Sequence, residues 1–185
     1  APAAAEESSL NQARAIFDTN FFGIIRMTRA VVPHMRRQGS GRIINMGSVL
    51  GFLPMPYMAL YSATKHAVAG YSEALDHELR TQGIRVSVVA PAYINTPFEA
   101  NLMQPDAPLD VYRDIRGDVE KRVKEVLVNS DGPDVVAEMV LEAARAGRPK
   151  LHYTPGLANR MQLLRRFAPA SMLDAGVRKD LRLPA

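Results

Sequence analysis

The stretch "IRVSVVAP", residues 84–91, decides the fold class. Its β-branched residues are typical of a parallel strand that is covered on both faces. A second apolar run, "RIINMGS" at residues 42–48, predicts a buried strand over about 42–47. Between the two runs we expect a long helix from about 57 to 82, ended by Gly83. The centre of the chain therefore predicts a strand–helix–strand unit.

Further elements extend this unit in both directions. Residues 8–37 predict a helix, with Ser9 and Gln12 in a capping-box pattern at its start. A long loop follows residue 91 and contains helical sequence over 110–127, a further helix is expected over 134–147, and a third strand over 150–154. This alternation predicts an α/β fold with a doubly wound, Rossmann-like parallel sheet and right-handed crossovers.

Composition limits the classes of function. The 185 residues are 47% hydrophobic and 23% charged, which fits a single globular domain. Cysteine is absent and the four histidines lack metal-ligand spacing, so we expect no metal site. The net charge of +4 comes from the tail, which argues against nucleic acid as a partner. No apolar run approaches the roughly 18 residues of a membrane span, and a cytoplasmic protein is expected.

A tyrosine and a lysine stand one helical turn apart in the predicted central helix. Tyr61 and Lys65 have the i,i+4 spacing that places two side chains on one face. A cation beside a phenol in a desolvated cleft would lower the phenol pKa from its usual value of about 10. Ser48 and the segment "PAYINTP" (91–97) follow the two predicted strands, and ligands bind at this edge of open α/β sheets. The pattern predicts an acid–base tyrosine at the sheet edge.

These residues resemble the classical short-chain dehydrogenases/reductases. The motifs that carry the resemblance are Asn20 in "FDTNFFG", Ser48 in "RIINMGS", Tyr61 and Lys65 in "YSATK", and "PAYINTP". The four motifs occur in the family's order, and the helix "YSATKHAVAGYSEALDHELR" is similar to the hydroxysteroid and retinol dehydrogenase-like branch. Pro91-Ala92 departs from the family's Pro-Gly, and the family's glycine-rich cofactor turn has no counterpart in this sequence. The resemblance thus covers the later half of the family fold.

The resemblance implies an enzyme that interconverts an alcohol with a ketone or aldehyde, using NADP or NAD. It implies four catalytic residues: Asn20 holding a water, Ser48 polarising the carbonyl, Tyr61 as general acid/base, and Lys65 lowering the Tyr61 pKa. Implied cofactor contacts are Tyr61, Lys65, Pro91, Ala92, Ile94 and Thr96. Implied substrate contacts are Ser48, Leu50, Tyr57 and Tyr61, and the apolar residues around them indicate a lipophilic substrate.

The sequence also predicts how this single domain, 1–185, is divided. Residues 97–130 are expected to form a substrate lid, and residues 157–185 a basic, amphipathic tail. The tail could lie on an anionic membrane, although folding over the substrate cleft or against a partner subunit is the expected outcome. Because family members dimerise through the helices that carry Asn20 and Tyr61, a homodimer or homotetramer is expected.

One alternative function stays open. The sequence begins without methionine and without the first strands of the family fold, so we expect a part of a longer enzyme. The alternative is a catalytically inactive, truncated family member that acts in dimerisation or interaction.

Overall fold

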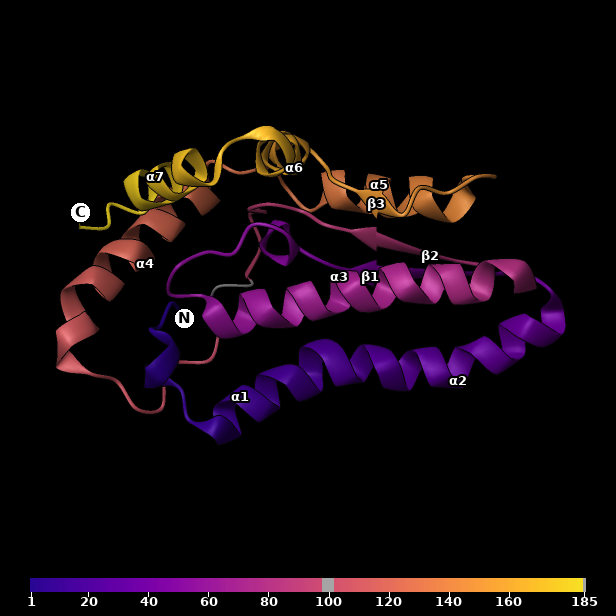
Figure 1. Cartoon of the computed structure of the whole chain (residues 1–185), viewed down its shortest axis with the longest axis horizontal. Coiled ribbons are helices and arrows are strands. Elements are labelled where there is room, and N and C mark those ends of the chain that lie inside the picture. Colours follow the sequence, from indigo (N-terminus) through magenta and orange to yellow (C-terminus); the bar gives the residue numbers. More distant parts are fainter. Residues whose placement is uncertain (98–101, 185) are drawn as a thin grey trace.

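A computed structural model describes residues 1–97 and 102–184. Within these residues it contains a parallel sheet in the order β1 (Gly41–Met46), β2 (Ile84–Val89) and β3 (His152–Tyr153), shown in Figure 1. The register pairs Gly41 with Ile84 and Met46 with Val89. Strands β1 and β2 confirm the sequence-based prediction. The third strand is shorter than predicted, because only His152 and Tyr153 pair with β2.

The first helical segment consists of three consecutive pieces. These are α1 (Leu10–Phe17), a π-helical turn η2 (Asp18–Phe22) and α2 (Gly23–Gln38). The Ser9 hydroxyl accepts a hydrogen bond from the Gln12 N–H, as the capping pattern predicts. A π turn contains one extra residue and is frequent at functional sites, and this turn carries Asn20.

The central helix α3 (Ala59–Leu79) starts two residues later than predicted. Tyr57 has a φ of +62°, which lies in the left-handed region. A right-handed α-helix cannot include a residue in this conformation, so α3 begins after Tyr57. At its other end a 3₁₀ turn, η4 (Arg80–Gln82), leads to Gly83. A Cβ atom at Gly83 would lie 2.1 Å from the Gly39 carbonyl oxygen, so only glycine fits at this close approach.

Helices cover both faces of the sheet. One apolar cluster joins Val32 of α2 and Leu75 of α3 to Ile43 and Val86 of the strands. A second cluster joins Val89 and Tyr153 to Ala143 of α5 (Asp134–Arg145). Successive strand residues point to opposite faces, so α5 lies on the face opposite α3, as Figure 1 shows.

This placement corrects the predicted crossovers. The chain moves across the sheet in one direction from β1 to β2 to β3, so two crossovers of the same hand would put α3 and α5 on one face. The two crossovers therefore differ in hand. The second one also contains η6 (Asp110–Tyr112) and α4 (Arg113–Val128) and is not a single helix laid directly between two strands.

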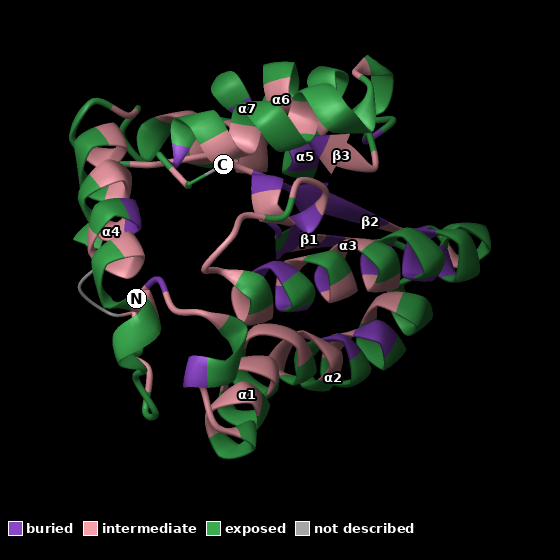
Figure 2. Ribbon diagram, turned by 60° about the vertical axis from the view of Figure 1, so that its left-hand side comes forward, coloured by how far each residue is buried: buried purple, intermediate pink, exposed green. Residues whose placement is uncertain are grey.

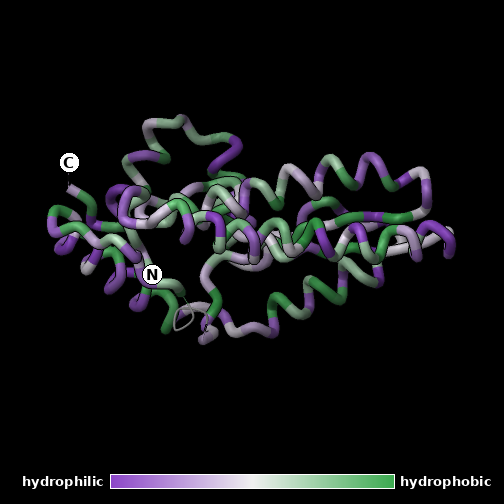
Figure 3. Tube along the Cα trace, turned by 90° about the horizontal axis from the view of Figure 1, so that it is seen from below, coloured by the Kyte–Doolittle hydropathy of each residue, from purple (hydrophilic) through white to green (hydrophobic). Residues whose placement is uncertain are grey.

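The remaining helices gather at the carboxyl end of the sheet, toward which the β2 arrow points in Figure 1. They are η1 (Ala5–Glu7), η3 (Val49–Gly51), α4, α6 (Leu157–Phe167) and α7 (Ala170–Asp180). Figure 3 shows that the helices alternate between hydrophilic and hydrophobic residues along their length. Helix α4 lies in the predicted lid, of which residues 98–101 are outside the described residues. None of the described helices is long and apolar enough to cross a membrane.

Candidate active site

The ends of β1 and β2 fix the loops that follow them. Backbone hydrogen bonds continue past both strands, from the Gly47 N–H to the Val89 carbonyl (2.8 Å) and from the Val49 N–H to the Pro91 carbonyl (2.8 Å). A Cβ atom at Gly47 would lie 2.6 Å from the Val88 side chain, so the loop packs directly against β2. Ser48 and Pro91 are therefore held side by side at the carboxyl edge of the sheet.

Ser48 connects this edge to the central helix. Its hydroxyl accepts a hydrogen bond from the Leu50 N–H (3.1 Å) and caps η3. The following turn packs so closely on α3 that a Cβ atom at Gly51 would lie 2.8 Å from the Lys65 carbonyl oxygen. Ser48 also hydrogen-bonds the Tyr61 phenol. The structure thus brings together the serine and the tyrosine that the sequence predicted.

The electrostatics of Tyr61 and Lys65 differ from the prediction. Burial raises the pKa of the Tyr61 phenol, and the Ser48 hydrogen bond lowers it only in part. The Lys65 ammonium donates to the Met46 carbonyl (3.0 Å) and lies 5.5 Å from the centroid of the Tyr61 ring. Burial lowers the pKa of Lys65. The Tyr61 pKa is therefore raised, and not lowered as the sequence predicted, because desolvation of the phenol dominates.

A cavity of about 1150 Å³ opens in front of these residues. One wall comes from the sheet edge and α3, and it contains most of the predicted site residues: Ser48, Leu50, Tyr61, Lys65, Pro91, Ala92, Ile94 and Thr96. The other wall comes from α4, α6 and α7, through residues such as Val123, Leu127, Leu164, Val177 and Leu181. Tyr93, which the sequence analysis did not single out, also lines the cavity and donates to the Met55 sulfur at 3.4 Å.

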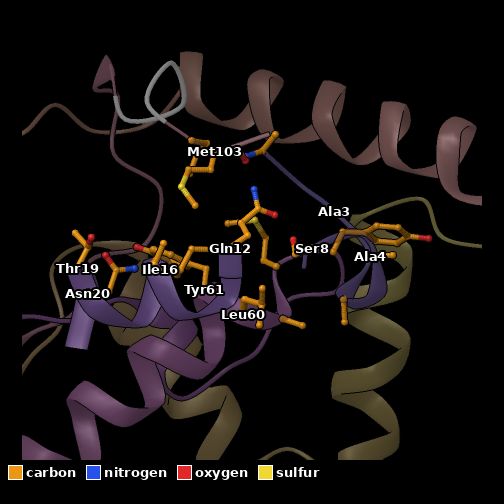
Figure 4. A pocket seen from close by; sticks show the side chains of 17 residues that line it. Ala3, Ala4, Ser8, Gln12, Ile16, Thr19, Asn20, Leu60, Tyr61 and Met103 are labelled. Atoms are coloured by element: carbon orange, nitrogen blue, oxygen red, sulfur yellow. The ribbon is translucent and has the colours of Figure 1, made fainter. Parts of the chain in front are cut away.

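Asn20 and Tyr57 lie in a second, smaller pocket of about 310 Å³, shown in Figure 4. Tyr61 borders both spaces. The Asn20 amide donates to the Thr64 hydroxyl (3.3 Å), which donates to the Tyr61 carbonyl (2.7 Å). The structure therefore places Asn20 behind the Tyr61 turn and Tyr57 before α3, and neither residue lines the larger cavity. The catalytic role of Asn20 and the substrate contact of Tyr57 stay predictions.

Gln12 is a residue of this pocket that sequence reasoning recognised only as a cap. Its amide nitrogen donates to the Gln104 carbonyl (2.6 Å). Its Oε1 atom is buried and has no hydrogen-bond partner among residues 1–97 and 102–184. Figure 4 shows the side chain between α1 and Met103. No local pattern marks such a residue, because its environment comes from segments about a hundred positions away.

A buried carboxylate fastens α4 and the turn before it to the start of the chain. Glu7 is fully buried and accepts hydrogen bonds from the Ala4 N–H (2.8 Å), the Leu109 N–H (2.9 Å) and the Arg116 guanidinium. Burial opposes ionisation, but these donors outweigh it and hold the Glu7 pKa below its usual value. At the other end of α4, Arg122 donates to the Asp180 carboxylate of α7 (2.6 Å).

Metal chemistry has no candidate in the part of the chain that the structure describes. No group of three or more His, Asp or Glu side chains is placed there to hold an ion. The reactive groups of the cavity include the hydroxyls of Ser48 and Tyr61 and the ammonium of Lys65.

The chain is similar to several known dehydrogenases in sequence and in structure. Retinol dehydrogenase 8 from Bos taurus is 31% identical over 170 residues, which cover 83% of this chain and 54% of the relative. A short-chain dehydrogenase from Streptomyces avermitilis has a TM-score of 0.72 at 28% identity, over 97% of this chain and 62% of that structure. The closed form of a serine dehydrogenase complexed with NADP+ has a TM-score of 0.69 at 25% identity, over 83% of this chain and 58% of that structure.

The matched part of the chain spans 31% of the length of one curated relative, a 3-ketodihydrosphingosine reductase from Bacteroides thetaiotaomicron, and 65% of another, an oxidoreductase from Bacillus subtilis. A family model described as short chain dehydrogenase matches residues 1–107, which is more than half of the chain. This match contains Ser48, Tyr61, Lys65 and the strand ends that hold them at one edge of the sheet. The chain therefore belongs to the short-chain dehydrogenase family.

Proposed function

We propose that this chain carries the catalytic part of an NAD(P)-dependent oxidoreductase. The enzyme would interconvert a lipophilic alcohol, in the first place a secondary alcohol, with the ketone or aldehyde that corresponds to it. The observation that carries the proposal is the Tyr61 phenol, hydrogen-bonded to Ser48 on the wall of a large apolar cavity. A phenol and a second hydroxyl at one point can together bind the oxygen of a carbonyl group.

Tyr61 acts as the general acid and base in this proposal. Its raised pKa keeps the phenol protonated at neutral pH, the form that donates a proton to the substrate oxygen during reduction. The Ser48 hydroxyl would hydrogen-bond the same oxygen. The Lys65 ammonium, 5.5 Å from the ring centroid, would stabilise the phenolate that remains. Asn20 acts as a positioning residue, since it reaches the Tyr61 turn through Thr64.

The residues at the strand ends fit the nicotinamide end of the cofactor. Pro91, Ala92 and Ile94 offer an apolar surface for a flat ring, while the Lys65 ammonium and the Thr96 hydroxyl can bind ribose and carboxamide groups. When bound, the cofactor supplies the hydride. The NADP+ in the serine dehydrogenase structure supports NADP as the cofactor, with NAD as the alternative.

The composition of the cavity supports a lipophilic substrate. Its helical wall is formed by Leu, Val and Met side chains, and a relative that acts as a retinol dehydrogenase is consistent with such a ligand. Residues 97–130 would act as the lid over this substrate, and we place the reaction in the cytoplasm.

We also propose that the protein works as a homo-oligomer. Leu10 and Phe22 are exposed large apolar residues and line one groove along α1 and η2. A second copy would cover this groove. Light scattering after size-exclusion chromatography tests this, with Phe22→Ser expected to shift the mass toward that of the monomer.

The test of the catalytic proposal is a pair of tyrosine substitutions on α3. Tyr61→Phe should lower turnover of lipophilic ketones by about 10³-fold, in the range of general acid catalysis, and leave NADPH affinity within about threefold. Tyr71→Phe is the control, because Tyr71 packs edge-on against Phe21 outside the cavity. Turnover by Tyr61→Phe near that of the wild type, or no binding of NADPH or NADH, would overturn the proposal and favour the inactive interaction protein.

A further inference from the structure

The outward face of α6 carries a row of exposed apolar side chains. Leu157, Leu163, Leu164 and Phe167 are 50%, 51%, 54% and 74% exposed, and we call them the α6 patch. At about 100° per residue these four positions fall within about a third of the helix circumference. Isolated exposed apolar residues are common, but four large ones on one face of a three-turn helix mark an interaction surface.

The opposite face of α6 holds the helix in this orientation. Ala158 is fully buried and Met161 lines the cavity. The Arg165 guanidinium donates to the Phe52 carbonyl beyond η3 (3.1 Å). Folding of the tail over the cavity therefore explains the residues on the inner face of α6 only. The apolar residues on its outer face require another explanation.

Cations surround the α6 patch. Arg160 lies within the same arc of the helix, and the Arg166 guanidinium lies 5.5 Å from the centroid of the Phe167 ring. Helix α7 adds the exposed Lys179, whereas Arg178 is half-buried and donates to the Pro184 carbonyl. Of the two acids between residues 157 and 184, Asp180 is already paired with Arg122. Apolar residues among Arg and Lys on one helix face are typical of helices that lie in the interface of an anionic membrane.

The patch also borders the substrate cavity. Leu164 is half exposed on the outer face and lines the cavity as well, and the same holds for Met172 of α7. Figure 2 shows α6 and α7 as the mostly exposed layer above the buried strands. A surface seated on α6 would therefore lie beside an apolar entrance to the cavity.

We propose that the α6 patch docks this protein onto the surface of an anionic membrane. Phe167 and Leu163 would enter the headgroup region, while Arg160, Arg166 and Lys179 contact anionic headgroups. A second copy of the chain fits this face less well, because a two-fold contact would bring Arg160 and Arg166 of both copies together with few acids to neutralise them. Docking in this orientation would let the cavity take a lipophilic substrate from the bilayer. This last step rests on the proposed function.

Vesicle binding tests the proposal. The full chain should co-sediment with vesicles of 70% phosphatidylcholine and 30% phosphatidylserine, and bind pure phosphatidylcholine vesicles at least about fivefold more weakly. Leu163→Ser combined with Phe167→Ser should lower the partition coefficient by at least about tenfold, because neither side chain lines the cavity and both are exposed. Val111→Ser is the matched control, since Val111 of η6 is 75% exposed and lies outside the patch.

Charge reversal tests the basic part of the surface. Arg160→Glu with Arg166→Glu should weaken binding to the phosphatidylserine vesicles by about tenfold, whereas Arg113→Glu, at an exposed site on α4, should change it less than twofold. No binding to either vesicle, or equal losses for the patch and control variants, would overturn the proposal. A shift of mass from dimer to monomer in the Leu163/Phe167 variant, without a change in vesicle binding, would assign the patch to a second copy.

The two proposals fail in different ways. Turnover of a water-soluble ketone measures the site alone, and the Leu163/Phe167 variant should retain it. If the wild type binds vesicles but reduces no ketone, the docking surface stands and the proposed function falls.

Discussion

The two walls of the cavity are built differently. The wall formed by the sheet edge and α3 carries Ser48, Tyr61 and Lys65 and rests on the apolar cluster around Leu75 and Val86. The wall formed by α4, α6 and α7 contains few fully buried side chains, among them Val119, Ala158 and Leu181. Figure 2 shows the buried residues gathered on α3, β1 and β2, with α4 standing apart from them. The hydroxyls of Ser48 and Tyr61 and the ammonium of Lys65 thus stand on the better-buried wall, while the helical wall of the cavity is held more weakly.

Polar contacts follow the same division. On the sheet side, the fully buried Asp76 accepts hydrogen bonds from the Arg85 guanidinium (2.8 Å), the Arg80 guanidinium (2.5 Å) and the Val86 N–H (2.9 Å). This network joins the end of α3 to β2. On the helical side, the contacts include the Glu7–Arg116 pair and the half-exposed Arg122–Asp180 pair. The difference predicts that equivalent substitutions cost more on the sheet side.

The largest effect is expected at Asp76. Asp76→Asn keeps the shape of the side chain but removes its charge and leaves the Arg85 guanidinium without its carboxylate. Breaking a buried pair in this way should lower the free energy of unfolding by about 3 kcal/mol, measured by urea denaturation. Asp110→Asn is the control, because Asp110 and its partner Arg113 are both largely exposed. Equal losses for the two variants would remove the distinction between the walls.

The next effect is expected at α4. Glu7→Gln removes the negative charge to which Arg116 and two backbone N–H groups donate hydrogen bonds. The free energy of unfolding should fall by about 2 kcal/mol. We expect hydrogen exchange to become faster in α4, about 30-fold, while amides of α3 stay protected. Glu120→Gln, which affects only the exposed pair with Lys124, should leave exchange in α4 unchanged. Faster exchange in α3 as well would show that α4 and the sheet unfold as one unit.

Acid should act on the sheet side in a defined pH range. Hydrogen bonds from Arg85, Val86 and Arg80 outweigh burial and lower the pKa of Asp76 from 3.8 to about 2. A lowered folded-state pKa contributes stability that is complete above the unfolded-state pKa and is lost as the pH falls through the folded-state pKa. The contribution is about 2 kcal/mol, lost between about pH 4 and pH 2. Subtracting the pH profile of Asp76→Asn from that of the wild type isolates it, and a flat difference would contradict the assignment.

The sheet wall could be predicted from the sequence because its determinants are local. The periodicity of apolar residues and the β-branched runs predict β1, α3 and β2. Because parallel strands end at one edge of a sheet, the loops after β1 and β2 bring Ser48 and Pro91 to the cavity that Tyr61 of α3 also lines. The i,i+4 spacing places Lys65 beside Tyr61, although burial reverses the expected direction of the Tyr61 pKa. The depth to which a phenol is buried depends on all neighbouring segments, so no local sequence pattern predicts the effect of burial on its pKa.

The helical wall could be predicted only in outline. The sequence indicates helices in the lid and tail, but the partners of Glu7 and Gln12 lie about a hundred residues away. The backbone conformation of Tyr57 and the position of α5 opposite α3 likewise depend on the path of long loops. Such contacts follow from the assembled fold, so composition and periodicity give no sign of them.

The smallest effect is expected where the helical wall is weakest. Arg122→Ala removes the bond to Asp180 between α4 and α7, and because both groups are partly exposed the free energy of unfolding should fall by only about 0.5 kcal/mol. Since Leu127, Val177 and Leu181 of these helices line the cavity, KM for a lipophilic ketone should rise about threefold while kcat stays constant. Lys121→Ala, at an exposed pair on α4, should change neither quantity. A fall in kcat with constant KM would mean that the helical wall positions the reacting groups as well, and the two walls would not divide chemistry from substrate binding.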